Sequence, residues 1–187
     1  LFEWESRTDS DPIRLNNTNY YVYGFIDGKF CPIEIDRSNW DLQSRFYSMK
    51  HGKFGLKYEV ICHVRTGRLL WVSGGVNASI HDLTLSRLSG ILQKLQLNEC
   101  LMGDKGYIGE DFILTPFKGR SADLSEPQRT WNQFVNHHRV RIENAIGRIT
   151  KYNILKIPFR SGTSLEERMS LHAVVMNVCC QLAALDL

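Results

Sequence analysis

The 187-residue sequence contains no CxxC pair, no long hydrophobic run and no large excess of charge of either sign. Its cysteines are odd in number, and Cys179 and Cys180 are adjacent, which makes them poor disulfide partners. We therefore expect reduced thiols in an intracellular protein, and zinc binding is the less favoured hypothesis. No segment is apolar enough to cross a membrane, and the N-terminus lacks a signal-peptide pattern. These absences argue against a disulfide-rich secreted protein and against a membrane protein.

Hydrophobic residues make up 43% of the chain and charged residues 23%, which are the proportions of an ordinary globular protein. At this length we expect one domain with one core. The formal net charge of +3 permits a nucleic-acid partner but does not by itself predict one. The positions of the basic residues must therefore decide that question.

Hydrophobic periodicity predicts alternating strands and helices behind a polar N-terminal arm at residues 1–19. Residues 56–64 alternate between apolar and polar side chains, as in a strand with one buried face. Helix starts are indicated at Asp82, at Ser125 and at Ser164, the last with Glu167 completing a capping box. The expected elements are strands at 20–28, 56–64 and 69–75, a helix at 83–97, strands at 100–103 and 111–116, and helices at 126–151 and 165–185.

This order of elements predicts an α/β fold. Three strands come first, and we expect the first pair to be antiparallel. A helix then leads to a fourth strand, and such a crossover places helices on the faces of the sheet. The predicted architecture is a mixed sheet flanked by helices.

Two aspartates stand in matching contexts, each after an apolar strand and close to a glycine. Asp27 lies in "GFIDGK" and Asp104 in "LMGDKGY". Ligands in open sheets bind beyond the carboxyl ends of the strands, and two carboxylates placed there repel each other unless a cation lies between them. Mg²⁺ or Mn²⁺ suits such hard oxygen ligands. The alternative is that each aspartate is simply a turn residue before glycine.

A third acidic candidate, Glu143, lies on the long predicted helix. At about 100° per residue, it falls beside the apolar stripe that would pack on the sheet, so it can reach over a strand end. Arg139 lies one turn earlier, and a surface ion pair with Glu143 is the alternative that spacing alone favours.

Four motifs in order resemble the DDE domain of PIF/Harbinger-type transposases, within the wider IS4/IS5-like DDE nucleases. They are "GFIDGK", "NASIHDLTL", "LMGDKGY…LTP" and "NHHRVRIENAIGRITKYNIL". The resemblance implies that residues 20–187 form an RNase H-like catalytic domain that cleaves DNA and transfers strands in the nucleus. It also implies that Asp27, Asp104 and Glu143 are the metal-binding catalytic triad.

The chemistry agrees with that implication, because three carboxylates can hold two Mg²⁺ or Mn²⁺ ions about 3.5–4 Å apart. No histidine base is then required. Asp82 matches an "HD" of the family that is not usually counted in the triad. We interpret it first as a helix N-cap, and alternatively as a carboxylate that supports or competes with the metal ligands.

Basic residues are expected to line the approach of a DNA substrate. Lys50, His51, Lys53 and Lys57 precede or enter the second strand, and other basic residues lie beside the three acids. Ordinary solvated surface positions are the alternative for any one of them. The DNA-binding candidates are Lys29, Lys105, Arg139, Arg141, Arg148 and Lys151.

Two other functions compete with transposition: a catalytically silent, domesticated module that binds protein or chromatin, and a nuclease that cuts without joining. The final helix is apolar almost all round, which predicts core packing or, alternatively, a homodimer contact or a contact with another region. No helix-turn-helix or zinc finger is evident. We therefore expect sequence-specific DNA recognition to lie upstream or on a separate partner protein.

Overall fold

A computed structural model describes residues 4, 11–16 and 18–185 of the chain. Two long strands, β2 (Tyr21–Pro32) and β4 (Lys53–His63), run antiparallel at the centre of a seven-stranded sheet. The strand β5 (Leu69–Asn77) pairs antiparallel with β4, while β6 (Glu99–Gly103) runs parallel to β2 and β7 (Ile113–Leu114) runs parallel to β6. The main order is therefore β5-β4-β2-β6-β7, which is a mixed sheet of the RNase H-like kind.

Two short strands extend this sheet. Within the predicted N-terminal arm, β1 (Ile13–Arg14) pairs antiparallel with the start of β2, whereas residues 1–3, 5–10 and 17 of that arm lie outside the described residues. The other short strand, β3 (Tyr47–Ser48), pairs with the start of β4. It follows the helix α1 (Trp40–Phe46), whose N-cap Asn39 accepts a hydrogen bond from the Leu42 amide at 3.2 Å. The sequence pattern did not predict α1, β1 or β3.

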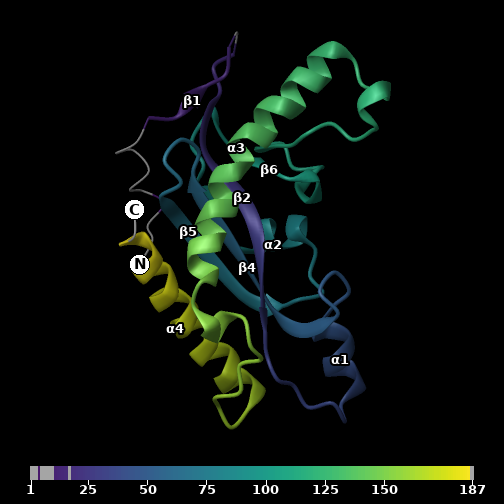
Figure 1. Cartoon of the computed structure of the whole chain (residues 1–187), viewed down its shortest axis with the longest axis vertical. Helices are drawn as coiled ribbons and strands as arrows, with labels where there is room; N and C mark the ends of the chain where they lie inside the picture. Colours follow the sequence, from purple (N-terminus) through teal and green to yellow (C-terminus); the bar gives the residue numbers. More distant parts are fainter. Residues whose placement is uncertain (1–3, 5–10, 17, 186–187) are drawn as a thin grey trace.

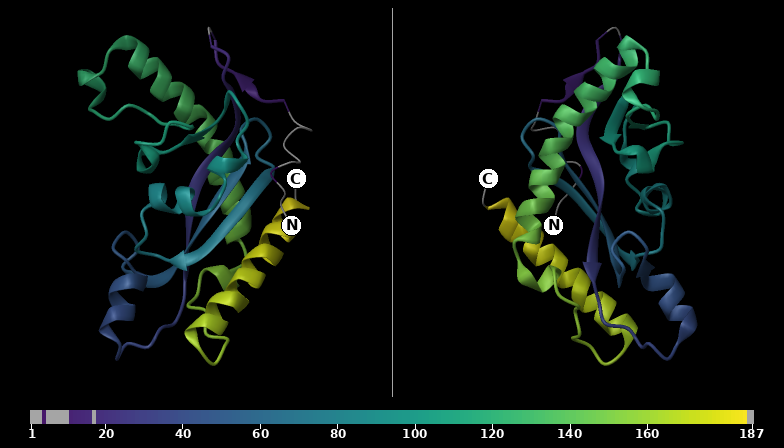
Figure 2. Two further views of the ribbon diagram at one scale, coloured as in Figure 1. Left: turned by 180° about the vertical axis from the view of Figure 1, so that it is seen from behind. Right: turned by 45° about the vertical axis from the view of Figure 1, so that its right-hand side comes forward.

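The helices cover the two faces of the sheet unequally (Figures 1 and 2). The long helices α3 (Glu126–Thr150) and α4 (Leu165–Ala184) pack on one face. The short helix α2 (Asp82–Leu88) and the 3-10 turns η2 (Leu92–Lys94) and η3 (Lys105–Tyr107) lie against the other. Two further turns, η4 (Ser121–Asp123) and η5 (Asn153–Leu155), stand before and after α3. We call the two sides the α3 face and the α2 face.

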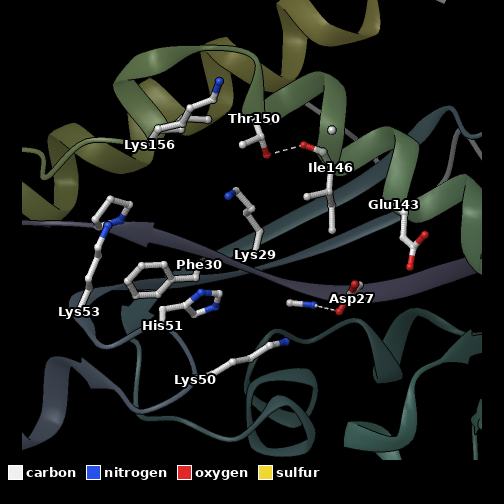
Figure 3. A pocket seen from close by; sticks show the side chains of 14 residues that line it. Asp27, Lys29, Phe30, Lys50, His51, Lys53, Glu143, Ile146, Thr150 and Lys156 are labelled. Atoms are coloured by element: carbon white, nitrogen blue, oxygen red, sulfur yellow. Dashed lines mark hydrogen bonds between the residues drawn. The ribbon is translucent and has the colours of Figure 1, made fainter.

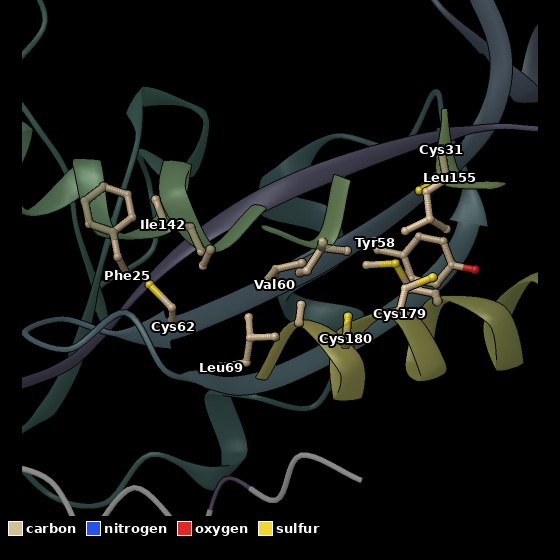
Figure 4. Packing of buried hydrophobic residues seen from close by; sticks show 14 of the residues in the cluster. Phe25, Cys31, Tyr58, Val60, Cys62, Leu69, Ile142, Leu155, Cys179 and Cys180 are labelled. Atoms are coloured by element: carbon tan, nitrogen blue, oxygen red, sulfur yellow. The ribbon is translucent and has the colours of Figure 1, made fainter. Parts of the chain in front are cut away.

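Alternation along β4 builds a core on each face. Tyr58, Val60 and Cys62 point to the α3 face, where they meet Ile142 of α3 and the cysteines of α4 (Figure 4). Ile61 points to the α2 face and packs in a second cluster with Tyr107. The predicted apolar face of this strand is confirmed, but the opposite face is covered as well, because Glu59 there is fully buried.

Both long helices begin where their capping residues predicted. At the start of α3 the Ser125 amide donates to Gln128 Oε1 at 2.9 Å in a reciprocal capping box. At the start of α4, Ser164 Oγ accepts from the Glu167 amide at 3.1 Å, and the Glu167 carboxylate accepts from the Thr163 amide at 2.6 Å and from its hydroxyl at 2.7 Å. These caps fix where each helix leaves its loop.

The predicted helix at 83–97 is wrong in its length. It ends at Leu88, and the chain passes through Gly90 at φ +81°, a conformation that glycine adopts readily, into η2. The predicted N-cap is also wrong, because His81 Nδ1 accepts the Leu83 amide at 3.3 Å while Asp82 lies in the first turn.

One side of α4 is buried, and the other is exposed. Met176, Cys180 and Ala183 are fully buried, which confirms core packing for that side. The other side carries a stripe of exposed apolar residues, and its contact with a second subunit or with another region stays a prediction. Its members are Leu171, Val174, Val178, Leu182 and Leu185.

All five cysteines are free and buried, as the predicted reduced state requires. Among the described residues, no helix is both long and apolar enough to traverse a bilayer.

Candidate active site

Asp27 and Asp104 lie immediately beyond the parallel pairing of β2 and β6. The last paired residues are Ile26 and Gly103, so each aspartate is the next residue of its strand or loop. The carboxylate of Asp27 accepts the Gly28 amide at 2.7 Å, and that of Asp104 accepts the Gly106 amide at 2.7 Å. The sequence-based prediction placed Asp27 at the end of its strand, which is wrong, because β2 continues to Pro32 along β4.

The electrostatics of Asp27 are those of a carboxylate crowded by other acids. Burial is the main cause that raises its pKa to about 6, and the Gly28 amide opposes this shift. The charges of Asp104 and, less strongly, Asp82 raise the pKa further, while Arg139 lowers it. A cation at this end of β2 would therefore relieve both the burial and the repulsion.

Glu143 faces Asp27 from α3. The two side chains line one cleft of about 580 Å³ between α3 and β2, and their carboxylates point toward one another in Figure 3. Arg139 Nε lies 3.0 Å from Glu143 Oε1, so the ion pair that spacing predicted is present as well. Because both partners are substantially exposed, that pair is worth less than about 1 kcal/mol. An ion pair this weak leaves Glu143 able to act as a metal ligand.

The donor set fits a hard divalent cation, but it is not closed around one. Asp27, Asp104 and Glu143 offer only carboxylate oxygens, which are the donors that Mg²⁺ and Mn²⁺ prefer. Within the described part of the chain, no three His, Cys, Asp or Glu side chains are near enough to form a metal site. The three residues therefore fit a metal ion by the type of their donor atoms, and not by their present separation.

Asp82 lies on the opposite face of β2 from Glu143. The side chain at position 28 would point to the α2 face, where a Cβ would lie 2.6 Å from Asp82 Oδ1. A Cβ on Gly106 would lie 3.0 Å from Asp82 Oδ2 and 2.9 Å from Asp104 Oδ1. Lys57 Nζ pairs with Asp82 Oδ1 at 3.1 Å. Asp82 is thus held between two glycines and a lysine, next to Asp104.

The predicted basic residues divide into two groups. Lys29 lines the cleft with Asp27 and Glu143, and Lys105 lies exposed directly after Asp104. Arg139 is the partner of Glu143. These three residues lie beside the acids.

The remaining three do not line the cleft. Arg148 Nη2 donates to the Gly67 carbonyl at 2.8 Å, and Arg141 lies against the same turn between β4 and β5. Lys151 lies over the ring of Tyr152, with 5.4 Å between its nitrogen and the ring centroid. On this structure Arg148 ties α3 to the β4–β5 turn.

Comparison with known proteins identifies the family. A family model described as "DDE superfamily endonuclease" matches residues 26–183, which include every acidic residue discussed above. The chain belongs to the DDE superfamily endonucleases. It is also 30% identical over 137 residues to a probable transposase for insertion sequence element IS702 from Microchaete diplosiphon. That match covers 70% of this chain and 47% of the relative, so the chain spans about half of the relative's length.

A comparison with solved structures found no match. The family match does not separate PIF/Harbinger transposases from other DDE endonucleases, so that subtype stays a prediction.

In this DDE endonuclease, sequence reasoning missed two residues of the cleft wall. Phe30 stacks on His51 with 4.4 Å between ring centroids and 13° between planes. Lys156, from the segment after α3, reaches the same cleft. Alternation in β2 places Phe30 on the opposite face from Asp27, so the pattern gave no reason to group the two. No local signal connects Lys156 to Asp27 either, because only the packing of α3 on β2 brings them together.

Proposed function

We propose that this chain is the catalytic domain of a transposase that cuts DNA and joins strands through Asp27, Asp104 and Glu143. The observation that carries the proposal is the end of the β2–β6 pairing. It sets Asp27 and Asp104 on adjacent strands, and Glu143 faces Asp27 across a cleft. Membership in the DDE superfamily endonucleases gives this arrangement its reaction class.

The three carboxylates would hold Mg²⁺ or Mn²⁺. When bound, such ions activate the attacking oxygen and stabilise the leaving oxygen of a phosphodiester. The raised pKa of Asp27 supports this role, because the carboxylate is desolvated and repelled by neighbouring acids that a cation would neutralise.

The remaining residues of the site would orient the DNA. Lys29 lies two residues after Asp27 on the same face of β2 and can contact a phosphate beside the cut. Arg139 pairs with Glu143 and fixes the direction of its carboxylate. Water supplies the oxygen that displaces the 3′ oxygen in cleavage, and a DNA 3′-hydroxyl supplies it in joining.

Several finer features of the proposal rest on the resemblance to PIF/Harbinger transposases. These are the subtype, a nuclear location, and dependence on a DNA-binding partner or region for recognition of the transposon ends. Imaging of the tagged protein in its host cells tests the location. A homodimer through the exposed stripe of α4 rests instead on the apolar residues of that helix, and it is tested by sedimentation of a Val178→Glu variant.

The test is metal-dependent cleavage of terminal-repeat DNA, with the DNA-binding partner supplied. We expect nicking with Mg²⁺ or Mn²⁺ and none with a chelator. A labelled 3′-hydroxyl end included in the same reaction reports joining. If the wild-type protein cleaves nothing under these conditions while it binds the DNA, the catalytic proposal fails.

A silent protein- or chromatin-binding module is the second candidate. Two observations favour it: the described carboxylates are not gathered into a metal-sized group, and α4 exposes an apolar stripe. Calorimetric titration with Mn²⁺ separates the two functions. Binding that disappears in Asp27→Asn supports the nuclease, and an absence of any binding supports the silent module.

A further inference from the structure

The cleft that holds Asp27 and Glu143 changes character along its length. Beyond the acids its wall is basic, with Lys29 of β2, Lys50 and Lys53 around the β3–β4 turn, and Lys156 after α3. Figure 3 shows these amines on the side of the cleft that leads away from Glu143. Four lysines against two carboxylates give the cleft a net positive lining.

The charges of several of these cations converge on His51. His51 stands among them, and its pKa is lowered first by burial and then by the charges of Lys50, Lys29, Lys57 and Lys53. Lys57 is paired with Asp82 on the α2 face. No ion pair is found for Lys29, Lys50, Lys53 or Lys156 within the described residues, so the basic end of the cleft calls for an external anion.

A flat aromatic surface lines the same cleft from the α2 side of β2. The Phe30 and His51 rings are stacked nearly parallel, and His51 is exposed. Stacking of bases on aromatic rings, combined with cations that follow the backbone, is how proteins hold unpaired strands. A duplex hides the faces of its bases, and a cleft of about 580 Å³ has the size of a small-ligand pocket rather than of a duplex groove.

We propose that the basic end of this cleft binds an unpaired DNA strand next to the cut phosphate, with Lys50, Lys53 and Lys156 on its backbone. His51, backed by Phe30, stacks on one base of that strand. The proposal rests on the proposed function for its placement beside a cut phosphate, but its central claim concerns binding and is measurable without catalysis.

The experiment measures the anisotropy of a labelled, unstructured DNA oligonucleotide of about 12 residues, within the span of single-strand sites. A chelator is present, so that no strand is cut. We compare Lys50→Ala/Lys53→Ala with Lys94→Ala/Lys118→Ala, which removes the same charge outside the cleft. The cleft variant should bind on the order of tenfold more weakly at 0.1 M salt, and its salt slope should fall by about 0.7 per lysine. The control pair should change neither by more than about twofold.

A second variant tests the aromatic surface. His51→Ala should weaken single-strand binding by about fivefold, at the lower end of what loss of a stacking side chain costs. It should leave the binding of the matched duplex unchanged. Lys156→Ala should weaken binding of the single strand from the opposite wall of the cleft.

Three results would overturn the proposal: wild-type protein that does not bind the single strand, cleft and control pairs that weaken binding equally, or His51→Ala that affects duplex and single strand alike. Failure of the proposed function has a different signature. Cleavage would then be absent while the lysine-dependent binding remained. Conversely, normal cleavage by Lys50→Ala/Lys53→Ala with unchanged binding would retain the nuclease and remove the strand site.

Discussion

The two faces of the sheet carry similar acidic side chains in opposite settings. On the α3 face, Asp27 and Glu143 line an open cleft, and the side chain of Glu143 is 55% exposed. On the α2 face, Asp82 is held by Lys57 and crowded by Gly28 and Gly106. A carboxylate that is already paired and enclosed has less to offer a ligand than one at an open cleft. This contrast is the reason that we propose the α3 face, and not the α2 face, as the place of the chemistry.

The comparison extends to the buried polar groups of β4. Tyr58 points to the α3 face, where its hydroxyl meets His172 Nδ1 at 2.8 Å. Glu59 points to the α2 face, where burial raises its pKa to about 7, against smaller opposing contributions from Ser89 and Trp71. Burial lowers the pKa of His172 to about 4. Each face thus favours the neutral form of its group, one a base and the other an acid.

The largest expected effect comes from the open face. Asp27→Asn should lower metal-dependent cleavage on the order of a thousandfold, the rate equivalent of losing several kcal/mol of charge stabilisation. Asp104→Asn and Glu143→Gln should do likewise in separate assays. Since the native carboxylate is desolvated and repelled, Asp27→Asn should not lower the melting temperature. A loss of activity accompanied by unfolding would leave the assignment unsupported.

The next effect is on stability and has opposite signs for His172 and Glu59. His172 holds no proton when folded between pH 4 and its ordinary value of 6.5, so its contribution is lost as pH falls through that window. Glu59 keeps its proton when folded between 4.5 and about 7, so its contribution is lost as pH rises through that window. Each amounts to about 3 kcal/mol, at about 1.4 kcal/mol per pKa unit.

Urea unfolding across pH 4 to 8 checks these signs through the variants His172→Asn and Glu59→Gln. The first should flatten the acid side of the stability profile, and the second should flatten its neutral side and be more stable than wild type at pH 8. Asp27 contributes in the same direction as Glu59, because its pKa is also raised, so Asp27→Asn should flatten the profile on the same side. Identical profiles for wild type and both variants would refute the contrast.

A smaller effect is expected when the enclosed face is disturbed. In Gly28→Ala the new methyl group would lie 2.6 Å from Asp82 Oδ1, so that side chain must move. If Asp82 supports Asp104, cleavage should fall about tenfold to a hundredfold, as for residues that orient metal ligands. Asp82→Asn should match it. Calorimetric Mn²⁺ affinity should weaken in both variants, whereas unchanged affinity with lower stability would make Asp82 purely structural.

The smallest effect concerns a cation outside the cleft. Arg148→Ala removes the bond to the Gly67 carbonyl, which should cost about 1 kcal/mol in the free energy of unfolding. Single-strand DNA binding should stay within about twofold of wild type, since one charge is lost away from the cleft. A salt slope that falls as in the lysine variants would instead place Arg148 in the DNA path.

The sequence predicts this fold well where one physical signal dominates. Alternation in β4 and the caps at Ser125 and Ser164 each specify an element locally, and the structure agrees. The pattern after Asp82 stays helical beyond its true end, because periodicity does not record that Gly90 leaves the helical conformation. The short elements α1 and β3 escape prediction, because few residues define them and the β4 partner fixes their place.

For the candidate site, the sequence indicates the acids but not their surroundings. Asp27 and Asp104 each carry a local strand-and-glycine context, so they can be paired from sequence. The end of β2 cannot be predicted from the sequence in this way. Its extension to Pro32 depends on β4, which supplies pairing partners as far as Gly55. The assembly of Lys29 and Lys156 in one cleft likewise depends on how α3 packs over β2.

Because β2 continues past Asp27, one rigid strand fixes the distance between the proposed catalytic residue Asp27 and the proposed DNA contact Lys29. Asp27 and Lys29 are two residues apart on one extended strand, so they share a face at a separation of roughly 7 Å. Their spacing is therefore insensitive to loop motion, unlike that of Lys50 or Lys156. Inserting one residue between them would turn the lysine to the α2 face while leaving every side chain present. Such an insertion would remove the proposed contact of Lys29 with DNA from the cleft and leave Asp27 in place.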